Sequence, residues 1–111
     1  MATPIPLPVD RALQRLGHSL SLARRRRQLS QQDLATRIGA SVNTVRRMEE
    51  GYPGTAIQHI ARALQVFGEL GRLEELLDTP HDMVGLALMD EKLPKRVRSL
   101  RSSGSSGDGA F

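Results

Sequence analysis

The chain contains no cysteine, no tryptophan, one tyrosine and two phenylalanines. Without cysteine it can form neither a disulfide nor a thiolate metal site, which suits a reducing compartment. Aromatic residues make up only 3% of the sequence, so a core has to be built from Leu, Ile, Val, Met and Ala. At 111 residues the chain is long enough for one domain and too short for two domains of typical size.

Long apolar runs, a targeting signal and catalytic patterns are missing too. No stretch reaches the ~20 consecutive apolar residues of a membrane span, and the start, MATPIPLPVDR, lacks the cations and apolar run of a signal peptide. The histidines at positions 18, 59 and 81 lack metal-ligand spacing, and no nucleophile is paired with a base. We therefore expect a cytoplasmic protein without membrane contact, enzymatic activity, metal or cofactor.

The charge that is present is unevenly distributed. The net charge is +4, but residues 1–50 carry nine arginines against four acids, residues 51–93 three cations against seven acids, and residues 94–111 four cations against one acid. This asymmetry predicts two surfaces with different partners. Charges spread over solvated faces for solubility would give the same totals, so both interpretations stay open at this point.

Proline, serine and glycine mark the two ends of the chain. Three prolines in TPIPLPV predict an extended N-terminal arm over residues 1–9. At the other end, residues 94–111 form a basic tail whose low-complexity stretch SSGSSGDG predicts disorder and is either natural or an artificial remnant. Residues 10–93 are left for one folded domain. The cations from Lys95 to Arg101 could contact either DNA or a protein partner.

Helix signals follow one another closely from residue 10. Asp10 can cap a first helix, in which Leu13, Leu16 and Leu20 lie on one face. The glycine at position 17 weakens this helix slightly. Because cations favour a helix C-terminus, the four consecutive arginines at positions 24–27 mark the end of the helix.

Two short helices follow. Ser30 and Asp33 have the spacing of a capping box, in which each side chain accepts a backbone N–H of the other residue, and Gly39 would end the helix that they open. Ser41 can cap a third helix that Gly51 would stop. The sequence thus predicts a pair of short helices joined at Gly39.

The rest of the chain also follows a helical pattern. Residues 55–58, TAIQ, have the form of another capping box and would open a fourth helix with Ile57 facing inward. Leucines at positions 70, 73, 76 and 77 indicate a fifth helix, and Thr79 with Pro80 would open a sixth that ends before Pro94. Because no stretch alternates between apolar and polar residues, the predicted fold class is all-α.

The stretch LSQQDLATRIGASVNTVRRMEEG, from residue 29 to residue 51, resembles the helix-turn-helix of the lambda-repressor-like, or XRE, family. The matching positions are Leu29, Ser30, Gln31, Leu34, Ala35, Ile38, Gly39, Ser41, Thr44, Val45, Met48, Glu49 and Gly51. The resemblance implies a five-helix lambda-repressor-like domain, to which this chain adds a C-terminal helix. It also implies that the protein binds double-stranded DNA with the third helix in the major groove.

The resemblance implies which positions face bases. They fall on Ser41, Val42, Asn43, Arg46 and Arg47. Arg can bond guanine through two N–H groups, Asn can pair with adenine, and Val could meet a thymine methyl. Two alternatives stay open: Val42 could serve packing instead, and at least one of the two arginines could reach only phosphate.

Phosphate contacts are implied for Gln31 at the start of the second helix and for Thr44, Arg25 and Arg27. Plain solvation of a helix terminus is the alternative for Gln31. Successive residues of a helix step by about 100°, so the four arginines cannot share a face and only one or two would touch DNA. Glu50 departs from the family pattern, which commonly has a basic residue there, and should either face away from phosphate or weaken binding.

The family commonly pairs an arginine of the first helix with the glutamate that closes the third. In this chain those positions are Arg24 and Glu49. We expect a direct or water-bridged ion pair between them that orients the third helix.

Farther along, LEELLDTPHDMVGLAL followed by EKLPKRVR resembles the extension of some HipB-like antitoxins. The resemblances together predict a repressor that binds a palindromic operator as a homodimer, within a toxin–antitoxin pair that represses its own promoter. The acidic stretch at residues 69–91 would suit a cationic toxin partner. A free-standing repressor without a toxin and a protein-interaction module without DNA binding are the alternatives.

Overall fold

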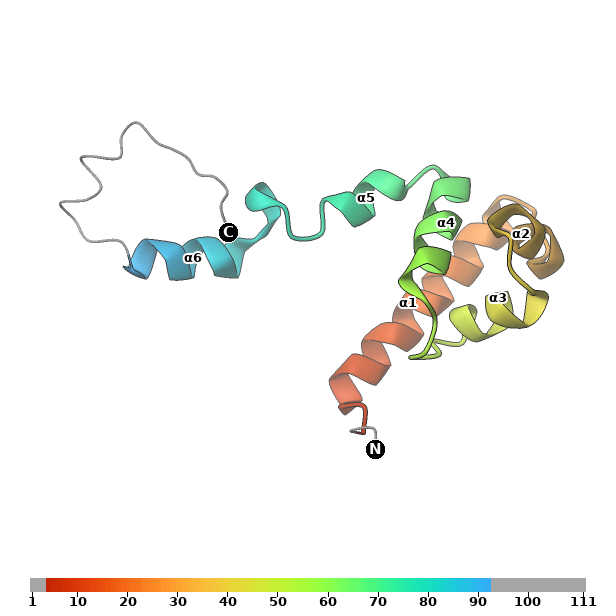
Figure 1. Ribbon diagram of the computed structural model, residues 1–111, viewed down its shortest axis with the longest axis horizontal. Coiled ribbons are helices and arrows are strands. Elements are labelled where there is room, and N and C mark those ends of the chain that lie inside the picture. Colours follow the sequence, from red (N-terminus) through yellow and green to blue (C-terminus); the bar gives the residue numbers. More distant parts are fainter. Residues whose placement is uncertain (1–3, 93–111) are drawn as a thin grey trace. The chain divides into compact units, whose positions relative to one another are not determined.

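The computed structural model describes residues 4–92, and every regular element within this range is a helix (Figure 1). The elements are α1 (Leu7–Arg26), α2 (Gln31–Ile38), α3 (Val42–Glu49), α4 (Ile57–Phe67), α5 (Leu70–Glu74), a 3₁₀-helix η1 (Thr79–His81) and α6 (Met83–Lys92). The predicted all-α class with an additional C-terminal helix is confirmed. No helix among these residues is long and apolar enough to cross a membrane.

The chain divides into two compact units after Leu73, and the single domain predicted over residues 10–93 stays a prediction. The physical reason lies in the later helices: none of α5, η1 and α6 contains a buried residue. The predicted basic tail over residues 94–111 lies outside the described residues.

α1 begins at Leu7, three residues before the predicted cap at Asp10. Pro8 fits the first turn, because its missing N–H would have no intrahelical acceptor there. The backbone N–H of Asp10 donates to the carbonyl of Pro6 at 3.0 Å. The predicted extended arm over residues 1–9 is therefore wrong for residues 7–9, which are helical; residues 1–3 lie outside the described range.

The helix pair joined at Gly39 forms as predicted. The Ser30 hydroxyl accepts the N–H of Asp33 at 2.9 Å, and the Asp33 carboxylate accepts the N–H of Ser30 at 2.8 Å. The bond from the Ser30 N–H to the ionised carboxylate lowers the pKa of Asp33. α2 ends at Gly39 in the left-handed region (φ 70°), where glycine has no steric penalty. The Ser41 hydroxyl then caps α3 by accepting the N–H of Thr44 at 3.1 Å.

At Gly17 the backbone of α1 lies directly against the end of α3. A Cβ atom at this position would lie 2.6 Å from the carbonyl oxygens of Met48 and Glu49. Sequence reasoning treats this glycine as a weakness of α1, but the structure requires it because any side chain would push the end of α3 away.

The core of the first unit lies where α1, α2, α3 and α4 pack together. Its buried apolar residues are Leu20, Leu34, Ala35, Ile38, Val45, Met48, Ala63 and Phe67. The core is therefore aliphatic except for Phe67, the last residue of α4. Leu16, expected to face the core, is 40% exposed.

The start of α4 differs from the prediction. The cap position is Ala56, which has no capping side chain, and Ile57 is 68% exposed instead of inward. The hydroxyl oxygen of Thr55 is buried and has no hydrogen-bond partner within residues 4–92. The capping box predicted over residues 55–58 is thus wrong, because the helix begins one residue too late for Thr55 to reach its free amides.

In the second unit α6 is capped by Asp82, whose Oδ1 accepts the N–H of Gly85 at 3.0 Å. Thr79, the predicted cap, instead begins the short η1. The predicted fifth helix ends already at Glu74, so Leu76 and Leu77 lie beyond it and are 66% and 75% exposed.

Candidate nucleic-acid interface

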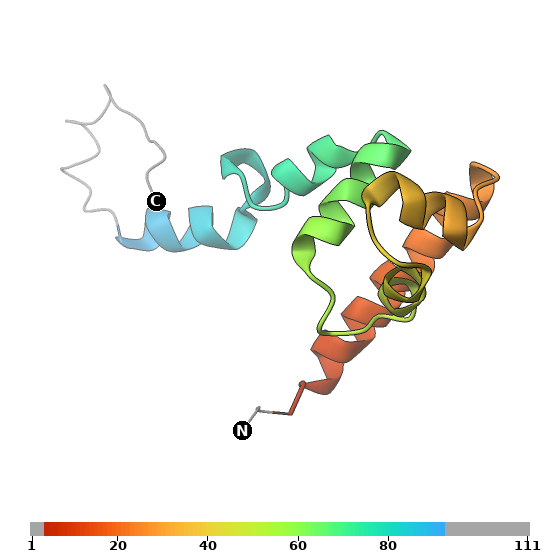
Figure 2. The ribbon, with the colours of Figure 1, turned by 45° about the vertical axis from the view of Figure 1, so that its right-hand side comes forward.

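α3 packs one face and exposes the other. Val45 and Met48 are buried against α1 and α2, while Arg46 and Arg47 are exposed and Val42 is accessible. Figure 2 looks almost along the yellow-green α3, where it crosses the orange α1. The exposed face carries polar and cationic side chains on a short helix with a capped N-terminus.

The ion pair expected between Arg24 and Glu49 is present. Nε of Arg24 lies 2.7 Å from Oε2 of Glu49, and Nη2 lies 3.1 Å from Oε1. This is the bidentate geometry in which guanidinium and carboxylate bond most strongly. The two side chains are only 9% and 5% exposed. The pair joins α1 to the last residue of α3.

Further hydrogen bonds extend this pair to α2. Nε2 of Gln31 donates to Oε1 of Glu49 at 3.0 Å, and Nη1 of Arg24 donates to the carbonyl of Leu29 at 2.7 Å. Burial raises the pKa of the Glu49 carboxyl, but the hydrogen bonds from Arg24 and Gln31 outweigh this effect and bring its pKa below the ordinary value. One guanidinium thus holds the α1–α2 turn and the end of α3 together.

Gln31 was expected to contact phosphate. It is half-buried at the first position of α2, and its amide nitrogen is engaged with Glu49. The side chain is therefore part of the buried network, and its phosphate contact stays a prediction.

Ser41 and Thr44 lie together at the N-terminus of α3. Beyond the capping bond, their hydroxyl oxygens are 3.1 Å apart, within hydrogen-bond distance of each other. Ser41 is exposed and Thr44 half-buried. Both hydroxyl groups are thus oriented by the cap, and the contacts predicted for them with DNA stay predictions.

Asn43 and Arg46 stand three residues apart on the exposed side of α3. Nη2 of Arg46 donates a hydrogen bond to Oδ1 of Asn43. The two predicted base-reading residues are therefore bonded to each other.

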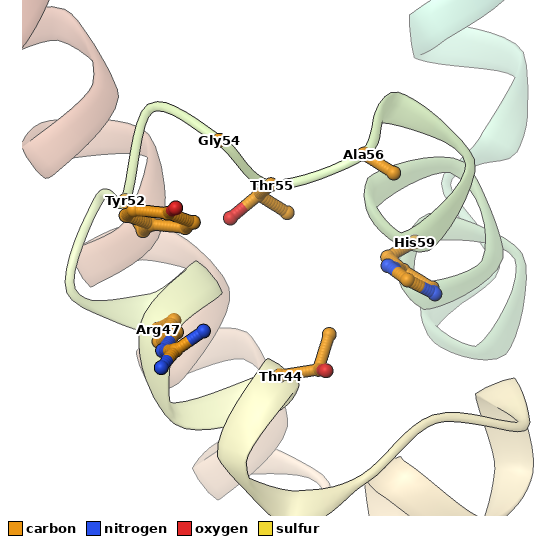
Figure 3. A pocket seen from close by; sticks show the side chains of 7 residues that line it. All are labelled: Thr44, Arg47, Tyr52, Gly54, Thr55, Ala56 and His59. Atoms are coloured by element: carbon orange, nitrogen blue, oxygen red, sulfur yellow. The ribbon is translucent and has the colours of Figure 1, made fainter.

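Arg47 lies beside Tyr52, with its guanidinium carbon 5.5 Å from the centre of the ring, a cation–π contact. Both residues line a shallow hollow of about 180 Å³, together with Thr44, Gly54, Thr55, Ala56 and His59 (Figure 3). The hollow lies between α3 and the start of α4. Arg47 is consequently directed toward the rim of this hollow.

The two arginines expected to contact phosphate differ. Arg25 is exposed. Arg27 donates to the carbonyl of Ala23 at 2.8 Å and to that of Phe67 at 2.9 Å, and its guanidinium stacks on the Phe67 ring at 5.0 Å. The carbonyl oxygens at the end of α4 attract this nearby cation, and the phosphate contact predicted for Arg27 stays a prediction.

Sequence reasoning missed two residues of this region. The sequence pattern assigned no role to Tyr52, which contacts Arg47, or to Arg62, whose Nη1 donates to the carbonyl of Ile38 at the end of α2 at 3.1 Å. The helix pattern gives no signal for such contacts, because they join residues that are 5 and 24 positions apart and meet only after folding.

Comparison with known families agrees with this geometry. The sequence pattern of the helix-turn-helix domain family matches residues 15–79, more than half of the chain. No curated protein and no solved structure shows a significant match. The chain belongs to the helix-turn-helix domain family, and it is a helix-turn-helix DNA-binding protein of the XRE-like type.

Proposed function

We propose that the protein is a sequence-specific transcriptional repressor that binds a palindromic operator as a homodimer. The observation that supports this most is the exposed polar face of α3, whose orientation is fixed by the buried ion pair of Arg24 and Glu49. A short, capped helix that presents polar residues from its first turns fits the major groove.

In this proposal the base edges are contacted from Ser41, Val42, Asn43, Arg46 and Arg47. Phosphates are contacted by Gln31, Thr44 and Arg25, which position the protein on the duplex without reading sequence. The location of Arg47 at the edge of the hollow also allows it to bind a neighbouring phosphate.

The dimer is proposed because one small module rarely binds its operator tightly enough by itself. Apolar side chains past Gly68 remain exposed, among them Leu76, Leu77, Val84 and Leu88 at 50–75%. Exposed apolar residues that gather in one patch are typical of a protein–protein contact, and we propose that these residues form such a patch. We therefore assign dimerisation to the segment after Gly68.

An antitoxin role is the more specific form of the proposal. It is favoured by the acidic and apolar character of α6 and the residues before it, which would suit a cationic toxin. A toxin gene that abuts or overlaps this one, whose product co-purifies with the protein, would support this role. If no toxin gene lies beside this one and no partner co-purifies, the protein would be a free-standing repressor. In either role we expect it to act in the cytoplasm.

A selection from randomised duplex DNA tests the proposal. We expect enrichment of sites with two inverted half-sites about one helical turn apart. Enrichment of single, unpaired half-sites would contradict the dimer, and failure to enrich any sequence would contradict specific DNA binding.

A further inference from the structure

Asn43 and Arg46 are bonded to each other on the exposed face of α3. Arg46 is exposed and Asn43 half-buried, and within residues 4–92 no ion pair involves Arg46. The partner of this guanidinium is thus a neutral amide. Unlike a carboxylate, the amide orients the guanidinium without neutralising the charge that attracts DNA.

The bond engages the oxygen that Asn43 would need to recognise adenine, and it leaves that oxygen one of its two lone pairs. An asparagine pairs with adenine by accepting from N6 through its Oδ1 while donating to N7 through its Nδ2. The Oδ1 of Asn43 already accepts from a cationic donor, and such charge-assisted bonds are about twice as strong as neutral ones. Pairing with adenine would therefore have to use the second lone pair of an oxygen that is already bonded to a cation, which makes this oxygen a weaker acceptor.

The same bond leaves Arg46 fully able to recognise guanine. A guanidinium has five N–H groups, of which a bidentate contact with guanine uses two and the bond to Asn43 uses one. A long side chain that is already oriented loses less conformational entropy on binding.

We propose that Asn43 is a positioning residue, which orients Arg46 toward a guanine and does not read a base of its own. This inference rests on the proposed function and revises the base-reading role predicted for Asn43. It implies that the two residues determine the preference at one base pair.

Selection from randomised duplex DNA, followed by titrations on the selected duplex and its single-base variants, tests the inference. The proteins are the full chain, Asn43→Ala, Arg46→Ala, the double variant, and Gln58→Ala on the exposed side of α4 as a control. We expect both single variants to relax the preference at the same base pair. Asn43→Ala should lower discrimination there about three- to tenfold, and the double variant should discriminate no less than Arg46→Ala.

Asn43→Asp keeps the acceptor for Arg46, and its charge suits the first turn of a helix. We expect it to prefer the same base pair while binding all duplexes more weakly. Relaxation at two different base pairs, with losses that multiply in the double variant, would overturn the role of Asn43 and leave the proposed function intact. A wild-type protein without any preferred sequence would overturn both.

Discussion

At the scale of single residues, Glu49 is the acid on which the orientation of α3 depends most. Replacing Glu49 by alanine would leave the buried guanidinium of Arg24 without a compensating negative charge. We expect Glu49→Ala to lower the free energy of unfolding by about 3 kcal/mol, because breaking a buried pair from one side leaves an unpaired charge. Urea unfolding measures this. Glu50→Ala, which changes the exposed neighbour, should stay within about 0.5 kcal/mol; equal losses for both would contradict the structural role of the pair.

The same carboxyl makes stability depend on pH. Its pKa is lower in the folded protein than the ordinary 4.5, so the folded state favours the ionised form. The stabilisation is complete above the unfolded-state pKa and is lost as the pH falls through the folded-state pKa. Asp33 has a shift of the same sign, so the measurement compares wild type with Glu49→Gln by urea unfolding across this acidic range. We expect the variant to lose less stability on acidification; identical pH profiles would rule out this contribution.

Arg47 and Arg25 are predicted to contact DNA in different ways, Arg47 through a base and Arg25 through a phosphate. If Arg47 contacts a base, Arg47→Ala costs roughly 1–3 kcal/mol on the selected duplex and little on a scrambled one. If Arg25 contacts phosphate, Arg25→Ala weakens both duplexes alike and reduces the slope of log affinity against log salt by about 0.9. Titrations of both variants at several salt concentrations distinguish the roles. Equal losses on both duplexes for Arg47→Ala would assign it to phosphate, which its position at the rim of the hollow permits.

At the scale of elements, the contact between α1 and α3 depends on Gly17. Gly17→Ala would place a methyl group 2.6 Å from two backbone carbonyl oxygens, which cannot rotate away as a flexible side chain could. We expect a loss of about 3 kcal/mol in unfolding free energy, at the upper end for overpacking, and weaker DNA binding because the end of α3 shifts.

Gly71→Ala is the matched control, because a Cβ atom in α5 meets no other atom within 4 Å. Alanine is the better helix former, so this variant should be neutral or slightly stabilising. Similar losses for the two variants would show that a general effect of replacing glycine, and not the close approach of the helices, explains the result.

Helix boundaries could be predicted only where local chemistry decides them. Ser30, Asp33, Gly39 and Ser41 act through neighbours within three or four residues, and α2 and α3 begin where these residues predict. The start of α4 was predicted wrongly because Ala56, which has no capping side chain, occupies the cap position instead of Thr55.

At the scale of the whole molecule, the exposed apolar residues after Gly68 predict self-association. Light scattering should give about twice the mass of 12.2 kDa at micromolar concentration. Leu88→Glu should shift the protein to a monomer and weaken operator binding, because a charge cannot be buried in an apolar contact without a partner. Gln65→Glu, on the exposed side of α4, is the control and should remain dimeric. A wild-type monomer, with and without DNA, would contradict the assignment.

By itself the sequence determined the helical class and the helix pair around Gly39, since helical periodicity and capping act over a few neighbouring residues. The resemblance to a known family added the candidate face of α3 and the pairing of Arg24 with Glu49. Only the tertiary structure decided that Arg27 stacks on Phe67, that Gln31 joins the buried network and that Asn43 is bonded to Arg46. Whether a polar side chain is turned inward, toward a neighbour or outward depends on which donors and acceptors the packed helices bring within about 3 Å, and residue order alone does not contain that distance.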